Sequence, residues 1–330
     1  MEWDHPWIAY SISSLSFSKK PFFLGWESSP PVSSLRRSSF CSFVSFVGVS
    51  TTTNKVEAHT VIAAEFMVMG HKAFSKDSVC IFSTRSGNTK EIVAAAKFCK
   101  EAGARTMVYV SNDNTPVCEY ADYKFYSPAE DPNLCEAIYS YTICLLGRFM
   151  KNAGAFDKYD EFMDRFAGLT KYLIAAKEKM DPVCQELARK FKDVDYHMVI
   201  GGGMLWGEAY DYAMCILEEM QWIRTKSIHV CEYFHGTLEL VEKDTSLILF
   251  YGEDETRPLM DRVLKFSKTV TDEITIFDTK DIELPFTDPE YRKIVSPIVI
   301  YAMTERLSAH LAKERNHPLT TRRYYRQMEY

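Results

Sequence analysis

The feature that most constrains the fold of this chain is a regular alternation of short apolar runs with longer amphipathic runs from about residue 61 onward. Short apolar runs are typical of buried strands, whereas apolar residues repeated with a period near 3.6 are typical of helices. Strand–helix alternation with short links predicts parallel sheets that are covered by helices on both faces. We expect strands at residues 78–82, 106–110, 123–126, 197–200, 227–231, 247–251 and 273–277.

The helices predicted by this alternation fall into two groups, separated by a long helical stretch. We expect them at residues 90–102, 134–150, 156–191, 207–222, 257–268 and 288–313. A break is expected near Pro182, because proline lacks the N–H group that continues a helix. The chain is therefore predicted to form two α/β units, each a doubly wound parallel sheet flanked by helices. Ligands of such sheets bind beyond the carboxyl ends of the strands.

The first 55 residues differ in character from the rest of the chain. They are rich in serine and show no sustained helical or strand period before Phe40. They also lack the cationic start and apolar core of a signal peptide, so we interpret residues 1–55 as an atypical segment, either a non-native extension or irregularly packed. We then expect a first α/β unit at residues 56–155, a helical connection at 156–192, and a second unit with a C-terminal helix and tail at 193–330.

The composition excludes several classes of protein. Hydrophobic residues make up 46% and charged residues 25% of the 330 residues, so the chain is expected to fold rather than to be disordered. A formal charge of −6 argues against nucleic acid as a partner, and no apolar stretch is long enough for a membrane span. Nine scattered cysteines without a C-x-x-C pair indicate neither a disulfide framework nor a zinc site. We expect them to be reduced and buried in a cytoplasmic protein.

A cluster of hydroxyl side chains follows the predicted strand at residues 78–82. The polar side chains of this turn belong to Ser83, Thr84, Arg85, Ser86 and Thr89. Free backbone N–H groups and the positive end of the helix dipole converge at such a turn, which favours an anion such as a phosphate. The alternative interpretation is that Ser86 and Thr89 only cap the helix.

The corresponding turn after the predicted strand at 197–200 carries three glycines at residues 201–203. It lacks the G-x-G-x-x-G pattern of a dinucleotide site, so no nucleotide cofactor is predicted. We expect these glycines to let a substrate or a helix approach closely.

Two further residues have the chemistry of a proton-transfer site. On the predicted helix at 207–222, Glu219 lies at the edge of the apolar face, whereas Glu218 points away from it. A carboxylate beside an apolar stripe is expected to have a raised pKa, which suits a general base, and the alternative is a boundary glutamate paired with a lysine. His235 follows a strand and an aromatic pair, where it is either an acid/base group or simply exposed.

The turn at residues 83–89 resembles the S-x-S-G-x-T loop with which sugar isomerase (SIS) domains bind the phosphate of a phosphosugar, with Thr84 in place of the first serine. The two-unit layout resembles a tandem SIS protein. Within that superfamily, Glu219, the run at 232–236 and the tail at 322–330 make the chain most similar to fructoselysine-6-phosphate and fructosamine-6-phosphate deglycases.

This resemblance covers about residues 56–330 and departs from the family at the front. Residues 43–47 would form the first strand and 48–51 a remnant of its loop, which leaves too little chain for a helix before residue 56. The first unit is therefore expected to be shortened at its N-terminus.

The resemblance also implies a role for each candidate residue. In the resembled isomerases the catalytic glutamate and histidine stand sixteen residues apart, as Glu219 and His235 do (235 − 219 = 16). Glu219 would be the proton-transfer base and His235 the acid/base of ring opening. The phosphate would be bound by Ser83, Thr84, Arg85, Ser86 and Thr89.

The implied reaction is the cleavage of a fructosamine 6-phosphate. Removal of a C1 proton gives an enaminol, protonation at C2 gives an aldose imine, and water splits the imine into glucose 6-phosphate and a free amine. The reaction requires no metal or organic cofactor, and we expect a homo-oligomer, a dimer or larger. Two alternatives stay open: an aldose–ketose isomerase of amino-sugar phosphates, and a phosphosugar-binding sensor without catalysis. The sequence does not identify the amine.

Overall fold

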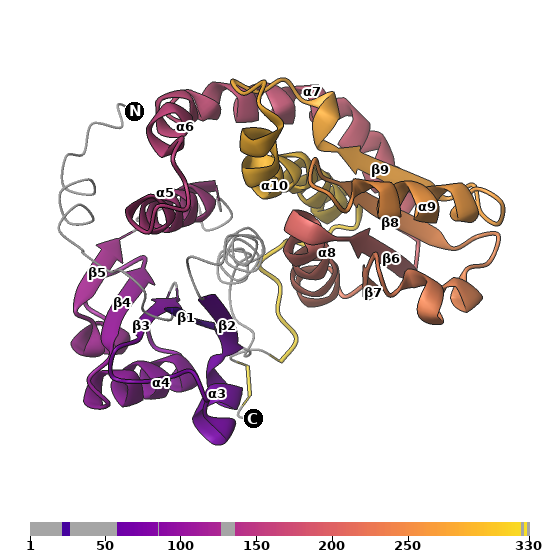
Figure 1. The fold of residues 1–330 in the computed structure, drawn as a ribbon. Coiled ribbons are helices and arrows are strands. Elements are labelled where there is room, and N and C mark those ends of the chain that lie inside the picture. The colour runs from indigo at the N-terminus through magenta and orange to yellow at the C-terminus, as the bar shows by residue number, and fades with distance from the viewer. Residues whose placement is uncertain (1–21, 27–57, 85, 127–135, 325–326, 329–330) are drawn as a thin grey trace. The chain divides into compact units, whose positions relative to one another are not determined.

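The computed structural model describes residues 22–26, 58–84, 86–126, 136–324 and 327–328 (Figure 1). These residues form two compact units, the first made of 22–26 with 58–167 and the second of 168–330. Each unit is built on one parallel sheet flanked by helices, which confirms the predicted fold class. No helix in the described part of the chain is long and apolar enough to cross a membrane.

The first unit contains a five-stranded parallel sheet with the strand order β2-β1-β3-β4-β5. The strands are β1 (Phe22–Trp26), β2 (Ala58–Ile62), β3 (Val79–Ser83), β4 (Arg105–Val110) and β5 (Tyr123–Tyr126). Strand β1 was not predicted, and the interpretation of residues 1–55 as an extension or irregularly packed was wrong for residues 22–26, which pair with β2 and β3. A short apolar run among serines carries no period that would distinguish a strand. The strand expected at residues 43–47 and its loop lie outside the described residues.

Helices cover both faces of the first sheet (Figure 1). Alternate side chains of a strand point to opposite faces, so β3 and β4 have apolar side chains that pack against helices on both sides. On one face Ile81, Met107 and Tyr109 pack against α5 (Glu136–Asn152). The side chains on the other face are Cys80, Phe82, Val108 and Val110, which pack against α3 (Ala63–Met69) and α4 (Lys90–Glu101). Helix α6 (Tyr159–Phe166) completes the unit.

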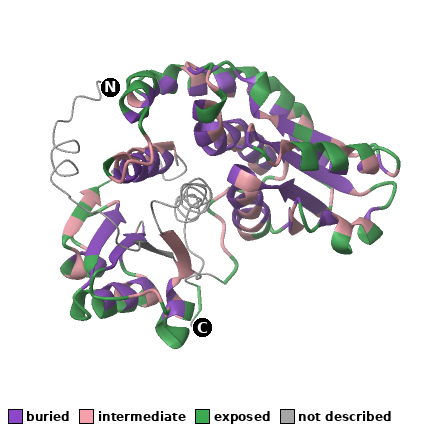
Figure 2. Cartoon of the chain, viewed as in Figure 1, coloured by how far each residue is buried: buried purple, intermediate pink, exposed green. Residues whose placement is uncertain are grey.

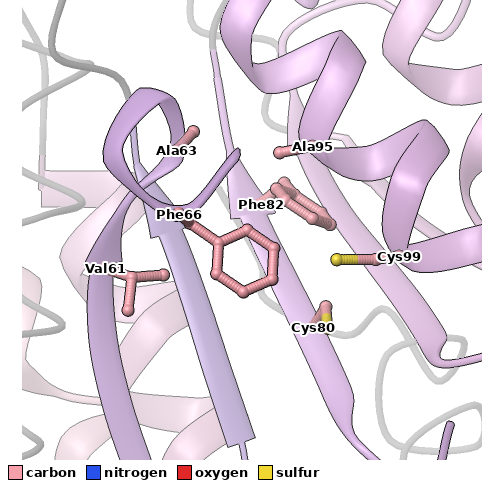
Figure 3. A pocket seen from close by; sticks show the side chains of 7 residues that line it. All are labelled: Val61, Ala63, Phe66, Cys80, Phe82, Ala95 and Cys99. Carbon is pink, nitrogen blue, oxygen red and sulfur yellow. The ribbon is translucent and has the colours of Figure 1, made fainter. Parts of the chain in front are cut away.

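A small apolar cavity of about 10 Å³ lies between β3, α3 and α4 (Figure 3). Its lining residues are Val61, Ala63, Phe66, Cys80, Phe82, Ala95 and Cys99. A cavity of this size holds at most one water, and an apolar lining offers such a water too few hydrogen-bond partners. The cavity is therefore a packing defect rather than a ligand site.

The second unit contains a four-stranded parallel sheet with the order β7-β6-β8-β9. The strands are β6 (Tyr196–Gly201), β7 (Arg224–His229), β8 (Ser246–Tyr251) and β9 (Ile274–Asp278). Helix α9 (Arg257–Ser267) packs on one face through Met260 and Val263. On the other face the Phe250 ring lies 5.9 Å from the ring of Tyr212. Figure 2 shows β6 and β8 as the buried centre of this unit.

The long helix expected at 156–191 is interrupted, but not where the sequence analysis placed the break. Helix α6 ends at Phe166, and α7 (Leu169–Phe191) runs through Pro182 without a break. The Pro182 side chain is exposed, and α7 packs along α10 (Pro289–Glu314) on its other side. Packing along the buried stripe holds α7 together across the missing hydrogen bond.

The seven cysteines in the described part of the chain are free thiols. Five of them are buried, as expected, and Cys144 is half-buried. The expectation of burial was wrong for Cys231, which is exposed because it lies in the loop after β7.

Candidate active site

The turn after β3 is held in shape around Gly87. This residue has a φ of +62°, a left-handed conformation that glycine adopts at little cost. A Cβ atom at this position would lie 2.1 Å from Thr115 Oγ1. The carbonyl of Gly87 accepts a hydrogen bond from the N–H of Val117 (3.0 Å), and its own N–H donates to Thr84 Oγ1 (3.2 Å). The turn is therefore fixed from within and braced by the segment at 115–117.

The predicted phosphate ligands of this turn differ in exposure. Ser83 and Thr84 are buried, whereas Ser86 and Thr89 are half-buried. Thr89 is the N-cap residue of α4, yet its side chain makes no capping hydrogen bond. The capping interpretation is thus not supported for Thr89. The structure brings these four residues together at the carboxyl end of β3, and Arg85 lies outside the described residues.

The glycine turn at residues 201–203 is occupied by a carboxylate of the same unit, that of Asp254. Asp254 accepts hydrogen bonds from the backbone N–H of Met204 (2.7 Å) and of Thr256 (2.8 Å). A Cβ at Gly203 would lie 2.5 Å from Asp254 Oδ2, and a Cβ at Gly201 would lie 2.9 Å from the Cβ of Ala209. The expected close approach of a helix is confirmed at Gly201, because Ala209 belongs to α8 (Trp206–Asp211). At Gly203 the approaching group is a carboxylate of this chain.

Glu219 lies near the end of a helix that changes type along its length. Helix α8 continues as a π-helix, η3 (Tyr212–Met220), in which an N–H bonds to a carbonyl five residues back. The N–H of Gln221, for example, donates to the carbonyl of Ile216 (3.0 Å). The expectation of an ordinary α-helix throughout residues 207–222 was therefore wrong for residues 212–220. π-Helical segments are rare and occur frequently at functional sites.

The surroundings of the two neighbouring glutamates differ as expected. The side chain of Glu219 is only 12% exposed. The exposed Glu218 accepts a hydrogen bond through Oε1 from the hydroxyl of Thr225 (2.6 Å), at the start of β7. Glu219 thus lies among buried residues at the edge of the apolar face, near the amino end of β7.

The C-terminal tail covers Glu219. Arg322 Nε lies 3.4 Å from Glu219 Oε1, and the Arg322 side chain is only 7% exposed. Arg322 Nη1 donates to the carbonyls of Leu319 (2.7 Å) and Thr321 (2.8 Å). The partner of Glu219 is therefore an arginine of the tail, not the lysine that the alternative interpretation expected.

Trp222 anchors the tail beside this pair. It has a φ of +56°, and its ring lies 4.4 Å from the ring of His317 and 4.1 Å from the guanidinium of Arg323. Gln221 Nε2 also donates to the carbonyl of His317 (2.8 Å). The residues on either side of Arg322 in the tail are thus held against the end of the Glu219 helix.

His235 lies in a different part of the second unit. It ends the short helix η4 (Tyr233–His235), in which the buried Tyr233 bonds the hydroxyl of Ser267 (2.8 Å) and Phe234 packs against Arg262 (4.1 Å). His235 itself is exposed. The aromatic pair therefore fixes the loop, while the imidazole faces the surroundings of the unit.

Glu219 and His235 are not brought together within one copy of the second unit. Glu219 lies near the amino end of β7, and His235 follows its carboxyl end. A strand rises about 3.3 Å per residue, so six residues separate the two positions by roughly 16 Å or more. Among the described residues, no cluster of three or more His, Cys, Asp or Glu side chains is arranged to hold a metal ion.

The pairing of Arg322 with Glu219 is the feature of this site that the sequence analysis missed. The arginine pair at 322–323 in a chain of net negative charge was the available signal. Sequence spacing does not reveal which carboxylate a tail residue reaches, because the contact depends on how the tail docks.

Comparison with known proteins gives a consistent picture. The model of the SIS domain family matches residues 39–146. The fructosamine deglycase FrlB of Bacillus subtilis is 32% identical over 274 residues, which cover 81% of this chain and 82% of the relative. The fructoselysine 6-phosphate deglycase of Escherichia coli is 23% identical over 72% of this chain and 68% of the relative.

Two solved structures share the fold over nearly the whole chain. One, from Bacillus subtilis, is assigned as a phosphosugar isomerase and superposes with a TM-score of 0.87 at 26% identity, covering 98% of this chain and 97% of the other. Another of the same assignment, from Salmonella typhimurium, has a TM-score of 0.83 at 30% identity, with the same coverage of both chains.

Proposed function

This chain belongs to the family of SIS-domain proteins that includes the fructosamine deglycase FrlB, and from that premise we propose that it is a fructosamine-6-phosphate deglycase. The proposed products are glucose 6-phosphate and a free amine. The observation that carries the proposal is the 32% identity with FrlB across 82% of that protein, since the similarity spans both units and not the phosphate turn alone.

The geometry of the first unit supports the phosphate half of this proposal. Ser86 and Thr89 are half-buried beside the N-terminus of α4, where backbone N–H groups and the helix dipole favour an anion. Thr84 holds the turn by accepting from the N–H of Gly87. We assign Ser86 and Thr89 to direct contact with the phosphate, and Thr84 to bracing the turn.

The chemistry is assigned to the second unit. Glu219 would take the C1 proton of the open-chain ketose and return it to C2, which converts the enaminol into the imine of an aldose. A largely buried carboxylate suits this task, because a site closed to water keeps the enaminol from exchanging its protons before the transfer is complete. Water then adds to the imine and releases the amine.

His235 lies too far from Glu219 in its own copy to reach the same sugar. We propose that it acts across a homo-oligomer, on a substrate held by the Glu219 of a second copy. An exposed imidazole on a loop fixed by Tyr233 and Phe234 is suited to that, since it can face another chain. Its task would be proton transfer during opening of the sugar ring.

Product analysis tests the function directly. The protein is incubated separately with the 6-phosphates of fructoselysine, fructose-asparagine and glucosamine. Glucose 6-phosphate and fructose 6-phosphate are each measured by coupled enzyme assays, and binding is measured by calorimetric titration. Glucose 6-phosphate from one of the two ketose adducts is expected. Conversion of glucosamine 6-phosphate alone would replace the deglycase by an amino-sugar isomerase, and binding without any product would make the protein a sensor.

Replacement of the carboxylate provides the residue-level test. Glu219→Gln is expected to abolish turnover, because the amide cannot accept the C1 proton, while sugar-phosphate affinity changes by no more than a few-fold, on the order of 1 kcal/mol. Glu218→Gln, one residue away and exposed, is the matched control and should retain activity. Steady-state kinetics and calorimetric titration measure the two effects. Comparable turnover in both variants would remove Glu219 from the mechanism.

A further inference from the structure

The ion pair between Arg322 and Glu219 differs from the structural ion pairs of the same unit. Arg292, for comparison, donates to both carboxylate oxygens of Glu253 at 2.7 and 2.8 Å and to three backbone carbonyls as well. The separation of Arg322 Nε and Glu219 Oε1 is 3.4 Å, longer than a strong charge-assisted hydrogen bond. This pair is therefore close enough to act electrostatically without fixing two elements rigidly together.

The guanidinium of Arg322 is nevertheless well oriented. Its Nη1 atom donates to the carbonyls of Leu319 and Thr321 in its own tail, so the Nε edge faces Glu219. With the two side chains only 7% and 12% exposed, water screens their attraction weakly. A guanidinium stays protonated at any working pH, so it favours the ionised form of its partner.

The tail does not depend on Arg322 for its attachment. The carbonyl of His317 accepts from Gln221 and its ring packs on Trp222, Arg323 also lies over the Trp222 ring, and Arg315 donates to the carbonyl of Gln221 (3.3 Å). These contacts lie on both sides of Arg322 along the chain. Holding the tail in place is thus not a sufficient reason for burying a cation beside Glu219.

We propose that Arg322 is a positioning residue for Glu219, holding the carboxylate ionised and aimed so that it can accept the C1 proton of the substrate. This inference rests on the proposed function. Arg322 keeps its own proton throughout, and the transferred proton passes from C1 to Glu219 and from Glu219 to C2. Arg322 then belongs to the active site, although the proton-transfer residue lies on the π-helix.

The test compares Arg322→Met with Arg323→Met. Both changes remove one positive charge from the same tail, but only the first removes the contact with Glu219. Arg322→Met is expected to lower kcat about 10- to 100-fold, the range that misplacement of a reacting group produces, with KM changed less than about 3-fold. Arg323→Met should retain kcat within about 3-fold, and thermal unfolding of the two variants should agree within a few degrees.

Rescue distinguishes a positioning role from a structural one. Arg322→Lys should recover part of the lost kcat, and added guanidinium chloride at low concentration should partly restore Arg322→Ala but not Glu219→Gln. Equal loss in Arg322→Met and Arg323→Met, or full activity in Arg322→Met, would overturn this inference while leaving the deglycase intact. A wild-type protein that releases no glucose 6-phosphate from any ketose adduct would overturn the proposed function and this inference with it.

Discussion

Gly87 combines two demands that only glycine meets. Its φ of +62° is unfavourable for residues with a Cβ, and a Cβ would also collide with Thr115 at 2.1 Å. The collision with Thr115 would affect the phosphate turn directly, because Thr115 belongs to the segment at 115–117 that braces this turn.

Gly87→Ala is therefore expected to lower both stability and sugar-phosphate affinity. The control is Gly70→Ala, at a φ of +66° and with no atom within 4 Å of the place that a Cβ would take. Gly70→Ala should cost about 1–3 kcal/mol, because its ψ of −170° belongs to a backbone region that essentially only glycine occupies, and it should leave affinity unchanged. Gly87→Ala should cost about 2–3 kcal/mol and, in addition, weaken binding about 10-fold or more. Urea unfolding and calorimetric titration measure these quantities. Equal effects on affinity at the two sites would mean that the turn does not bind the phosphate.

The candidate site residues were predictable to the extent that local patterns encode them. The hydroxyl cluster, the boundary position of Glu219 and the loop position of His235 all follow from residue types and periodicity. The hydrogen bond from Gly87 to Thr84 and the approach of Arg322 to Glu219 depend on chain geometry that periodicity does not contain.

At the scale of elements, the expected helix break near Pro182 and the expected ordinary helix at 212–220 were both wrong, for related physical reasons. Pro182 does not end α7, because packing along α10 outweighs the loss of one backbone hydrogen bond on the exposed side. The apolar residues of the π-helix at 212–220 likewise fit the period of an ordinary α-helix, so the sequence pattern does not reveal its wider turn. Tertiary packing decided both outcomes, and a single sequence reports such packing only indirectly.

The pairing of β6 with β8 carries a testable pH dependence through His197. This residue is buried on β6, with Nδ1 2.8 Å from the Ser246 hydroxyl on β8 and its ring 4.6 Å from that of Phe191. Burial, assisted by the positive charge of Arg315, lowers the pKa of His197 to about 4. The imidazole is thus neutral in the folded protein at pH values where the unfolded chain is already protonated.

Stability is expected to fall as the pH drops from 6.5 toward 4. Within that window the unfolded state binds a proton that the folded state does not, so protonation of His197 favours unfolding. The free energy of unfolding is expected to be about 2 kcal/mol lower at pH 5 than at neutral pH for this reason. Urea unfolding of the wild type and of His197→Asn at about pH 7 and pH 5 measures this. The variant should lose about 2 kcal/mol less than the wild type over the same interval. Parallel losses in the two proteins would show that His197 is not the responsible group.

At the scale of the molecule, the alternation of strands and helices was sufficient to predict two parallel α/β units. The missing part was β1, which pairs with β2 and β3 although it precedes them by a long stretch of chain. Such a pairing depends on long-range contacts with the rest of the sheet. A short apolar run in a serine-rich segment does not predict it.

The arrangement of Glu219 and His235 at opposite ends of β7 leads to a prediction about the assembly. If each site combines a glutamate from one copy with a histidine from another, Glu219→Gln and His235→Gln should both be inactive alone but active after mixing, unfolding and refolding together. Random dimers would regain roughly a quarter of wild-type activity, since half are mixed and each mixed dimer has one intact site. Glu219→Gln mixed with the Glu219→Gln, His235→Gln double variant should stay inactive. Failure of the first mixture to regain activity, although mixed dimers form, would show that the two residues do not share a site across copies.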